Sequence, residues 1–149
     1  MGLDMYLTKK VYVGAQYEFR KVTGKIEIFA DGKEIPVNFS RVSYVEEAVG
    51  YWRKANAIHK WFVDNVQEGK DDCKAYYVPT EDLRKLLALV QDVIAHPEKA
   101  SVLLPTQDGF FFGGTEYDEY YTEDLKLTEK ILTECLNDPD GEYYYHSSW

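Results

Sequence analysis

Residues 51–62, YWRKANAIHKWF, combine aromatic and polar side chains that could form a binding site. Trp52 could stack on a base or another flat ring, while Arg53 and Asn56 could read its polar edges or hold a phosphate. On a helix, His59 falls in the apolar stripe itself, one turn after Asn56. Two interpretations therefore stand: these four residues line a ligand pocket, or Asn56 and His59 are buried polar residues that are paired by hydrogen bonds.

A second candidate site is the run TEYDEYYTED at residues 115–124. The chain has 13 tyrosines, and three of them lie here among five carboxylates. Tyrosine is stiff and amphipathic, and ring faces edged with carboxylates attract cations. We therefore expect a protein-binding surface that grips a basic partner. Its residues are Tyr117, Asp118, Glu119, Tyr120 and Tyr121. The alternative is that the tyrosines serve only to pack a sheet.

Patterns for catalysis and metal binding are weak. The three histidines and two cysteines show no HxxH or CxxC spacing, so we expect no metal and no cofactor. Cys73 lies near Lys70 and Lys74, which would favour a thiolate, and His59 would be its base if the loop folded back. Cys73 and Cys135 are expected to be free thiols. A small enzyme that uses His59 or Cys73 is the least favoured hypothesis.

The charge is unevenly distributed. The net charge is −9, and residues 101–149 carry all of it, with only Lys126 and Lys130 against 11 acids. Because binding to DNA or RNA depends on cations, we expect no direct nucleic-acid binding. No apolar run is long enough for a transmembrane helix, and the start has no signal-peptide pattern. We therefore expect a cytoplasmic protein without membrane contact.

The elements that must position these residues follow from their periodicity. Apolar residues spaced three and four apart predict a helix over roughly 44–66, which would carry the first candidate site. Two TEDL motifs predict helices over 80–95 and 122–137, with Thr80 and Thr122 as N-caps. Strands are expected within 3–13, in a hairpin over 25–39 that turns at Asp31-Gly32, as a pair within 101–115, and at the C-terminus. Alternation in Tyr143–Tyr145 would bury one ring and expose two.

This order of elements predicts an α+β fold in a single domain, 1–149. A mainly antiparallel sheet would be packed with about three helices. The length fits one domain, since a chain of this size can bury a substantial core.

Several segments together resemble a group of small bacteriophage and prophage proteins. They are MGLDMYL at the start, the segment YWRKANAIHKWFV, the stretch LLPTQDGFFFGGTEYDEYY and the ending SSW. The group has no established activity, so no functional residues can be transferred from it. The resemblance implies a cytosolic accessory protein in the infected host, and small phage proteins of this kind often neutralise host factors.

Two main hypotheses result. The first is a phage-encoded binding protein, such as an anti-defence inhibitor, that engages a basic host protein through the acidic tyrosine surface. The second is a small-molecule binder, such as a sponge for a nucleotide signal, that uses Trp52, Arg53, Asn56 and His59.

Overall fold

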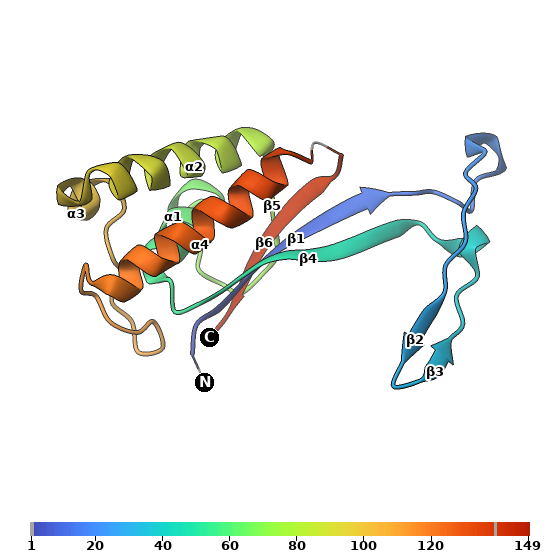
Figure 1. The fold of residues 1–149 in the computed structure, drawn as a ribbon, viewed down its shortest axis with the longest axis horizontal. Coiled ribbons are helices and arrows are strands. Elements are labelled where there is room, and N and C mark those ends of the chain that lie inside the picture. Colours follow the sequence, from blue (N-terminus) through green and yellow to red (C-terminus); the bar gives the residue numbers. More distant parts are fainter. Residues whose placement is uncertain (1, 139) are drawn as a thin grey trace.

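The main sheet has four antiparallel strands in the order β4-β1-β6-β5 (Figure 1). The computed structural model describes residues 2–138 and 140–149. The strands of this sheet are β1 (Asp4–Tyr12), β4 (Tyr44–Arg53), β5 (Tyr76–Val78) and β6 (Glu142–Ser148). β1 and β6 come from opposite ends of the chain and pair at the centre of the sheet. The fold therefore depends on contacts between residues that are distant in sequence.

Helices pack on one face of this sheet. They are α1 (Asn56–Asn65), α2 (Thr80–Ala95), the short α3 (Ala100–Leu103) and α4 (Glu119–Leu136), with a 3-10 turn at Pro97–Lys99 between α2 and α3. α2 and α4 lie side by side (Figure 1). The predicted α+β class is confirmed. The 80–95 helix is also confirmed, and the predicted 122–137 helix begins earlier, at Glu119.

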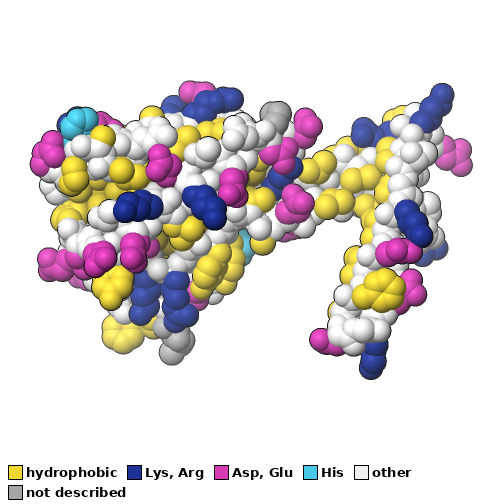
Figure 2. Space-filling view, viewed as in Figure 1, with side chains coloured by type: hydrophobic (Ala, Val, Ile, Leu, Met, Phe, Trp, Pro, Cys, Tyr) yellow, Lys and Arg dark blue, Asp and Glu magenta, His cyan; other side chains and the backbone are white. Residues whose placement is uncertain are grey.

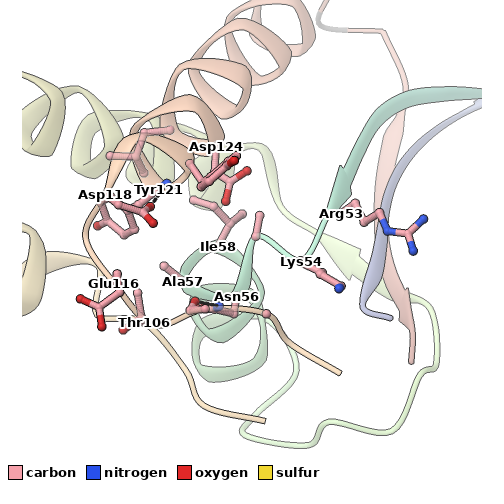
Figure 3. Close-up of a pocket in the computed structure, with 15 residues that line it drawn as sticks. Arg53, Lys54, Asn56, Ala57, Ile58, Thr106, Glu116, Asp118, Tyr121 and Asp124 are labelled. Atoms are coloured by element: carbon pink, nitrogen blue, oxygen red, sulfur yellow. Dashed lines mark hydrogen bonds between the residues drawn. The ribbon is translucent and has the colours of Figure 1, made fainter. Parts of the chain in front are cut away.

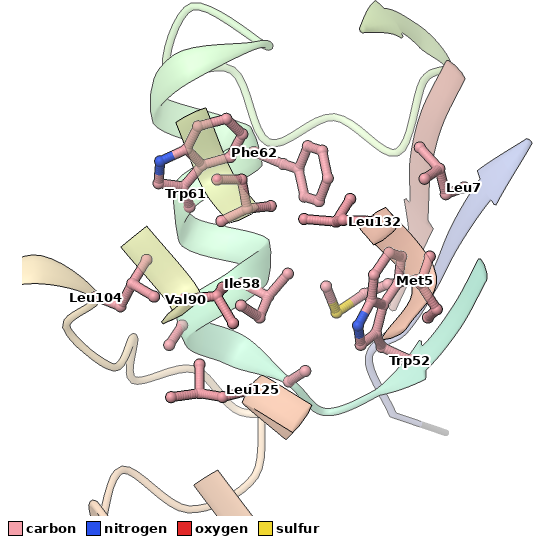
Figure 4. Close-up of a cluster of buried hydrophobic side chains, with 14 of the residues drawn as sticks. Met5, Leu7, Trp52, Ile58, Trp61, Phe62, Val90, Leu104, Leu125 and Leu132 are labelled. Atoms are coloured by element: carbon pink, nitrogen blue, oxygen red, sulfur yellow. The ribbon is translucent and has the colours of Figure 1, made fainter. Parts of the chain in front are cut away.

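The core forms between the helices and every second residue of the strands. Met5 and Leu7 of β1 and Trp52 of β4 point into it together with Ile58 and Phe62 of α1 (Figure 4). The alternation is what a half-buried strand requires, because successive side chains point to opposite faces. The Phe62 ring also stacks on Tyr145 of β6, with ring centres 4.0 Å apart.

The predicted helix over 44–66 is wrong in its first half. Residues Tyr44–Arg53 form strand β4, and the helix begins only at Asn56. β4 has a bulge opposite Leu7 and Thr8 of β1, which are paired with Gly50 and Ala48. A bulge adds a residue and changes which positions face inward, so an alternating pattern no longer marks the strand. Trp52 and Arg53 therefore belong to a strand and not to the helix that carries His59.

Four smaller expectations are also wrong. Residues 101–115 hold the end of α3 and an irregular segment, where Phe110 is 95% exposed, and not two buried strands. Thr122 is not the N-cap of α4, because Asp118 caps it by accepting a hydrogen bond from the Tyr121 amide. Thr80 lies inside α2, after Pro79. In the C-terminal strand, Tyr143 and Tyr145 are both buried and Tyr144 is half-buried.

Residues 13–43 form an arm that projects from the body. β1 and β4 continue past the other strands as a two-stranded ribbon, and the arm lies at its far end (Figure 1). The arm contains the hairpin β2 (Ile28–Ala30) and β3 (Lys33–Ile35), and two 3-10 turns at Glu18–Arg20 and Phe39–Arg41. The predicted hairpin and its turn at Asp31-Gly32 are confirmed.

Candidate functional site

A cavity of about 310 Å³ opens between the start of α1, the segment 106–118 and the first turns of α4 (Figure 3). Its apolar floor is formed by Ala57, Ile58 and Leu125. Its walls include three carboxylates and two tyrosines, namely Glu116, Asp118, Asp124, Tyr120 and Tyr121, and the cations Arg53 and Lys54 also line it. The cavity thus combines residues from both candidate sites, which the sequence places about 60 positions apart.

Asn56 fixes one wall of the cavity. It is buried at the start of α1, and its Nδ2 donates to the carbonyl oxygens of Phe112 at 3.0 Å and Gly114 at 2.8 Å. Its Oδ1 accepts from the Gln107 amide at 2.9 Å. One side chain thus satisfies three backbone groups of a segment that has no regular secondary structure. The polar groups of Asn56 are engaged in holding this segment, so its role here is to shape the cavity.

We expect Asn56→Ala to loosen the segment 106–114 and to lower the free energy of unfolding by about 2 kcal/mol, because three backbone groups lose their partner. Hydrogen exchange of the Gln107 amide should rise strongly in this variant. Asn65→Ala is the matched control, since Asn65 makes one hydrogen bond, to the carbonyl oxygen of Trp61 within the same helix. Equal exchange of Gln107 in both variants would contradict the assignment.

His59 lies in the core and does not reach the cavity. Its side chain is 1% exposed, and both ring nitrogens have partners: Nε2 lies 3.0 Å from Asp71 Oδ2, and Nδ1 lies 2.7 Å from the Tyr145 hydroxyl. Because an ionised carboxylate can only accept, Nε2 carries the proton, and in the neutral ring Nδ1 accepts from Tyr145. The same carboxylate accepts from Trp149 Nε1 at 3.1 Å, which ties the C-terminus to this cluster.

The other residues of the first candidate site also differ from the expectation. Trp52 is buried, and its Nε1 donates to Thr128 Oγ1 of α4 at 2.8 Å, so its ring is not available for stacking on a ligand. Arg53 lies at the rim of the cavity, and its guanidinium points away from the carboxylates (Figure 3). The structure therefore does not bring Trp52, Arg53, Asn56 and His59 together around one ligand space.

The second candidate site divides into two parts. Asp118, Tyr120 and Tyr121 line the cavity, whereas Tyr117 and Glu119 are not among its lining residues. Tyr117 packs edge-on against Tyr121. Tyr121 is buried and donates to the carbonyl oxygen of Leu104 at 2.8 Å. Tyr120 is 77% exposed and is therefore the ring that a partner can reach.

Asp124 also lines the cavity, and the sequence analysis did not single it out as a candidate. Burial raises the pKa of this carboxyl to about 7, and the neighbouring Glu123 and Asp118 carboxylates add to the effect. An acid that is half-ionised at neutral pH beside a cavity is a common mark of a functional site. The sequence did contain one indication of Asp124: it lies four residues after Tyr120, and residues four apart share one face of a helix.

The cysteines offer no catalytic arrangement. Cys73 is exposed on the loop between α1 and β5, and Cys135 is buried in α4; both are free thiols. Burial raises the pKa of Cys135 to about 11. His59 cannot serve as a base for Cys73 in this conformation, because its two nitrogens are paired with Tyr145 and Asp71.

Within residues 2–138 and 140–149, no group of three or more His, Cys, Asp or Glu side chains is placed to hold a metal ion. In the same described part of the chain, every helix is too short or too polar to cross a membrane.

Comparisons with known proteins found no match among family models, curated proteins or solved structures.

Proposed function

We propose that this chain is a binding protein without catalytic activity, and that its cavity receives a lysine or arginine side chain of a partner protein. The observation that carries the proposal is that Glu116, Asp118 and Asp124 all line one cavity with an apolar floor. A basic side chain has an apolar stem and a charged end, so it suits a space with an apolar floor and acidic walls. Tyr120 would cover the cation with its ring face.

The charge of the whole chain supports this choice. A net charge of −9 steers basic partners toward the protein and repels phosphates. The nucleotide alternative loses support because the three carboxylates outnumber the two cations, Arg53 and Lys54, that line the cavity. In addition, Trp52 and His59 are buried. In the phage setting that the sequence resemblance implies, the partner would be a host protein with a basic surface, and binding would neutralise it.

The proposal is tested with a blocked tripeptide, acetyl-Gly-Arg-Gly-amide, titrated while backbone amide NMR shifts are followed. The matched ligand replaces arginine with citrulline, which has nearly the same shape and no charge. We expect the shifts of Ala57 and Tyr121 to respond to the arginine peptide alone. Equal binding of the citrulline peptide, or no binding of either at millimolar concentration, would count against the proposal.

Variants then locate the site. Asp124→Asn keeps the shape and removes the charge, and it should weaken binding of the arginine peptide about tenfold or more, as expected for loss of a charge-assisted contact. Glu119→Gln removes the same charge from the same helix outside the cavity, so it should change affinity less than about twofold. If Glu119→Gln weakened binding as much as Asp124→Asn, the acidic surface and not the cavity would be the site.

Affinity should also depend on pH. A bound cation favours the ionised carboxylate, so it binds better where Asp124 is already ionised. With the pKa near 7 in the free protein, the ionised fraction rises about tenfold between pH 6 and pH 8, and the affinity should rise with it. In Asp124→Asn this dependence should disappear. An affinity of the original protein that stays constant over this range would contradict the role of Asp124.

A further inference from the structure

The arm carries apolar side chains that its own chain leaves largely exposed. All residues from 15 to 43 are described, and each is exposed or half-exposed. In the hairpin, Ile28 lies directly opposite Ile35, and both are exposed. Val37, two residues after Ile35 and beyond the end of β3, is also exposed. A two-stranded hairpin is marginally stable alone, so an arm of this kind is expected to be completed by another surface.

The body has a second uncovered surface, the face of the main sheet opposite the core. Tyr6 is central on this face, with Tyr51 of β4 on one side and His146 of β6 on the other; the ring centres are 5.4 and 4.7 Å from Tyr6. Tyr144 and Tyr77 form the adjoining pair, with ring centres 5.8 Å apart. Tyr51 is 48% exposed and Tyr77 is 53% exposed. These five residues, Tyr6, Tyr51, Tyr77, Tyr144 and His146, define the aromatic face. Because it lies opposite the core, packing of the core does not account for its aromatic side chains.

The ribbon keeps these two surfaces apart within one chain. It runs from the body to the arm through Tyr12 and Tyr44, which are paired across the strands, and hydrophobic side chains follow it (Figure 2). The hairpin lies at the far end of the ribbon, away from the helices (Figure 1). In this structure the apolar side of the arm therefore lies far from the aromatic face of its own sheet (Figure 1).

The charges favour a contact between two copies through the arm. Residues 13–43 carry five basic and four acidic side chains, a net charge of +1, while the remaining 118 residues carry 12 basic and 22 acidic side chains, a net charge of −10. Two bodies repel each other, whereas the arm is the part that can approach a second body without repulsion. Reciprocal exchange of two arms also gives a closed pair with twofold symmetry.

We infer that the chain forms a reciprocal dimer in which the apolar side of each arm packs on the aromatic face of the other copy. Such a dimer buries both exposed surfaces of each copy, and the contact between an arm and an aromatic face is formed twice. This inference is independent of the proposed cation site, because the arm and the aromatic face contribute none of the cavity carboxylates.

The test is sedimentation analysis over a range of protein concentrations. The wild-type protein should change from monomer to dimer as concentration rises. The arm variant, Ile28→Thr with Ile35→Thr, keeps β-branched side chains and removes apolar surface from the arm. The sheet variant, Tyr51→Ser with Tyr77→Ser, removes two rings from the aromatic face. Each double variant should raise the dimer dissociation constant about tenfold or more. Val102→Thr is the matched control, since Val102 is an exposed apolar residue on α3, outside both surfaces, and it should leave the constant unchanged.

Mixing the two double variants decides which surfaces meet. The intact arm of the sheet variant can pack on the intact face of the arm variant, so the mixture regains one of the two contacts. We expect the mixture to form a heterodimer at concentrations where each variant alone is monomeric. A wild-type protein that stays monomeric at millimolar concentration, a dimer that survives both variants, or a mixture that forms no heterodimer would each overturn the inference.

Discussion

Replacing His59 with alanine should lower the free energy of unfolding by about 3–5 kcal/mol. Three effects add up in this variant. A large buried side chain leaves a cavity beside Phe112, whose ring meets the imidazole edge-on. The Tyr145 hydroxyl, in a fully buried residue, loses its hydrogen-bond partner. Asp71 loses one of its two donors and keeps only Trp149. Urea unfolding followed by tryptophan fluorescence would measure the change.

His96→Ala is the control for this experiment. His96 is exposed at the end of α2 and pairs with Asp92, one turn earlier, so its loss should cost less than about 1 kcal/mol. Where His59→Ala remains folded, its affinity for the arginine peptide should be close to that of the original protein, since His59 does not line the cavity. A variant with unchanged stability and lost binding would reverse the assignment of His59 as a core residue.

Elements that depend on local patterns could be predicted from the sequence. The 80–95 helix has its acidic first turn and a regular apolar stripe, and the hairpin has Asp31-Gly32 at its turn. The central strand was expected from its β-forming residues. Each of these features lies within one short window, so a neighbouring segment is not needed to recognise it.

β4 could not be recognised in the same way. Its partner β1 lies about 40 residues earlier, and a bulge between Ala48 and Gly50 interrupts the alternation along the strand. Val45, Ala48 and Trp52 also have the three- and four-residue spacing of a helix that would continue into α1. Lys54, between strand and helix, adopts a left-handed conformation with φ 58°. This conformation is uncommon for lysine, so the break between strand and helix could not be predicted from the residue type.

The candidate site could be predicted only in part. Three residues of the acidic tyrosine run, Asp118, Tyr120 and Tyr121, line the cavity. The segment around Asn56 contributes a wall and not a ligand-binding group, because one amide holds three backbone groups of a distant loop. Such a contact joins residues more than 50 positions apart, and no local pattern encodes it. Asp124 became a candidate only once its burial was known.

Asp124→Asn should make the protein more stable at pH 8 and leave its stability nearly unchanged near pH 4. The pKa of Asp124 is near 7 in the folded chain and near 3.8 when the group is exposed, so the folded state holds a proton that the unfolded state has lost between these values. Stability from this group is fully present below about pH 4 and is lost as pH rises through about 7. Asparagine never ionises, so the variant escapes this loss.

At pH 8 we expect the free energy of unfolding of Asp124→Asn to exceed that of the original protein by about 1–2 kcal/mol. The full pKa shift would correspond to a larger difference, but partial exposure of the carboxyl to solvent reduces it. Carboxylates with a lowered pKa, such as Asp92 beside Lys99 and His96, act in the opposite direction at low pH. They are common to both proteins, so the difference between the two unfolding curves isolates Asp124. Thermal or urea unfolding at pH 4, 6 and 8 would measure it, with Glu119→Gln as the control that should show no such trend. A difference that shrinks as pH rises would contradict the raised pKa. We expect Asp124→Asn to be more stable at pH 8 and to bind the arginine peptide less well. Together these two results would show that the protein gives up stability by burying the Asp124 carboxylate, and that this carboxylate contributes to binding of the cation.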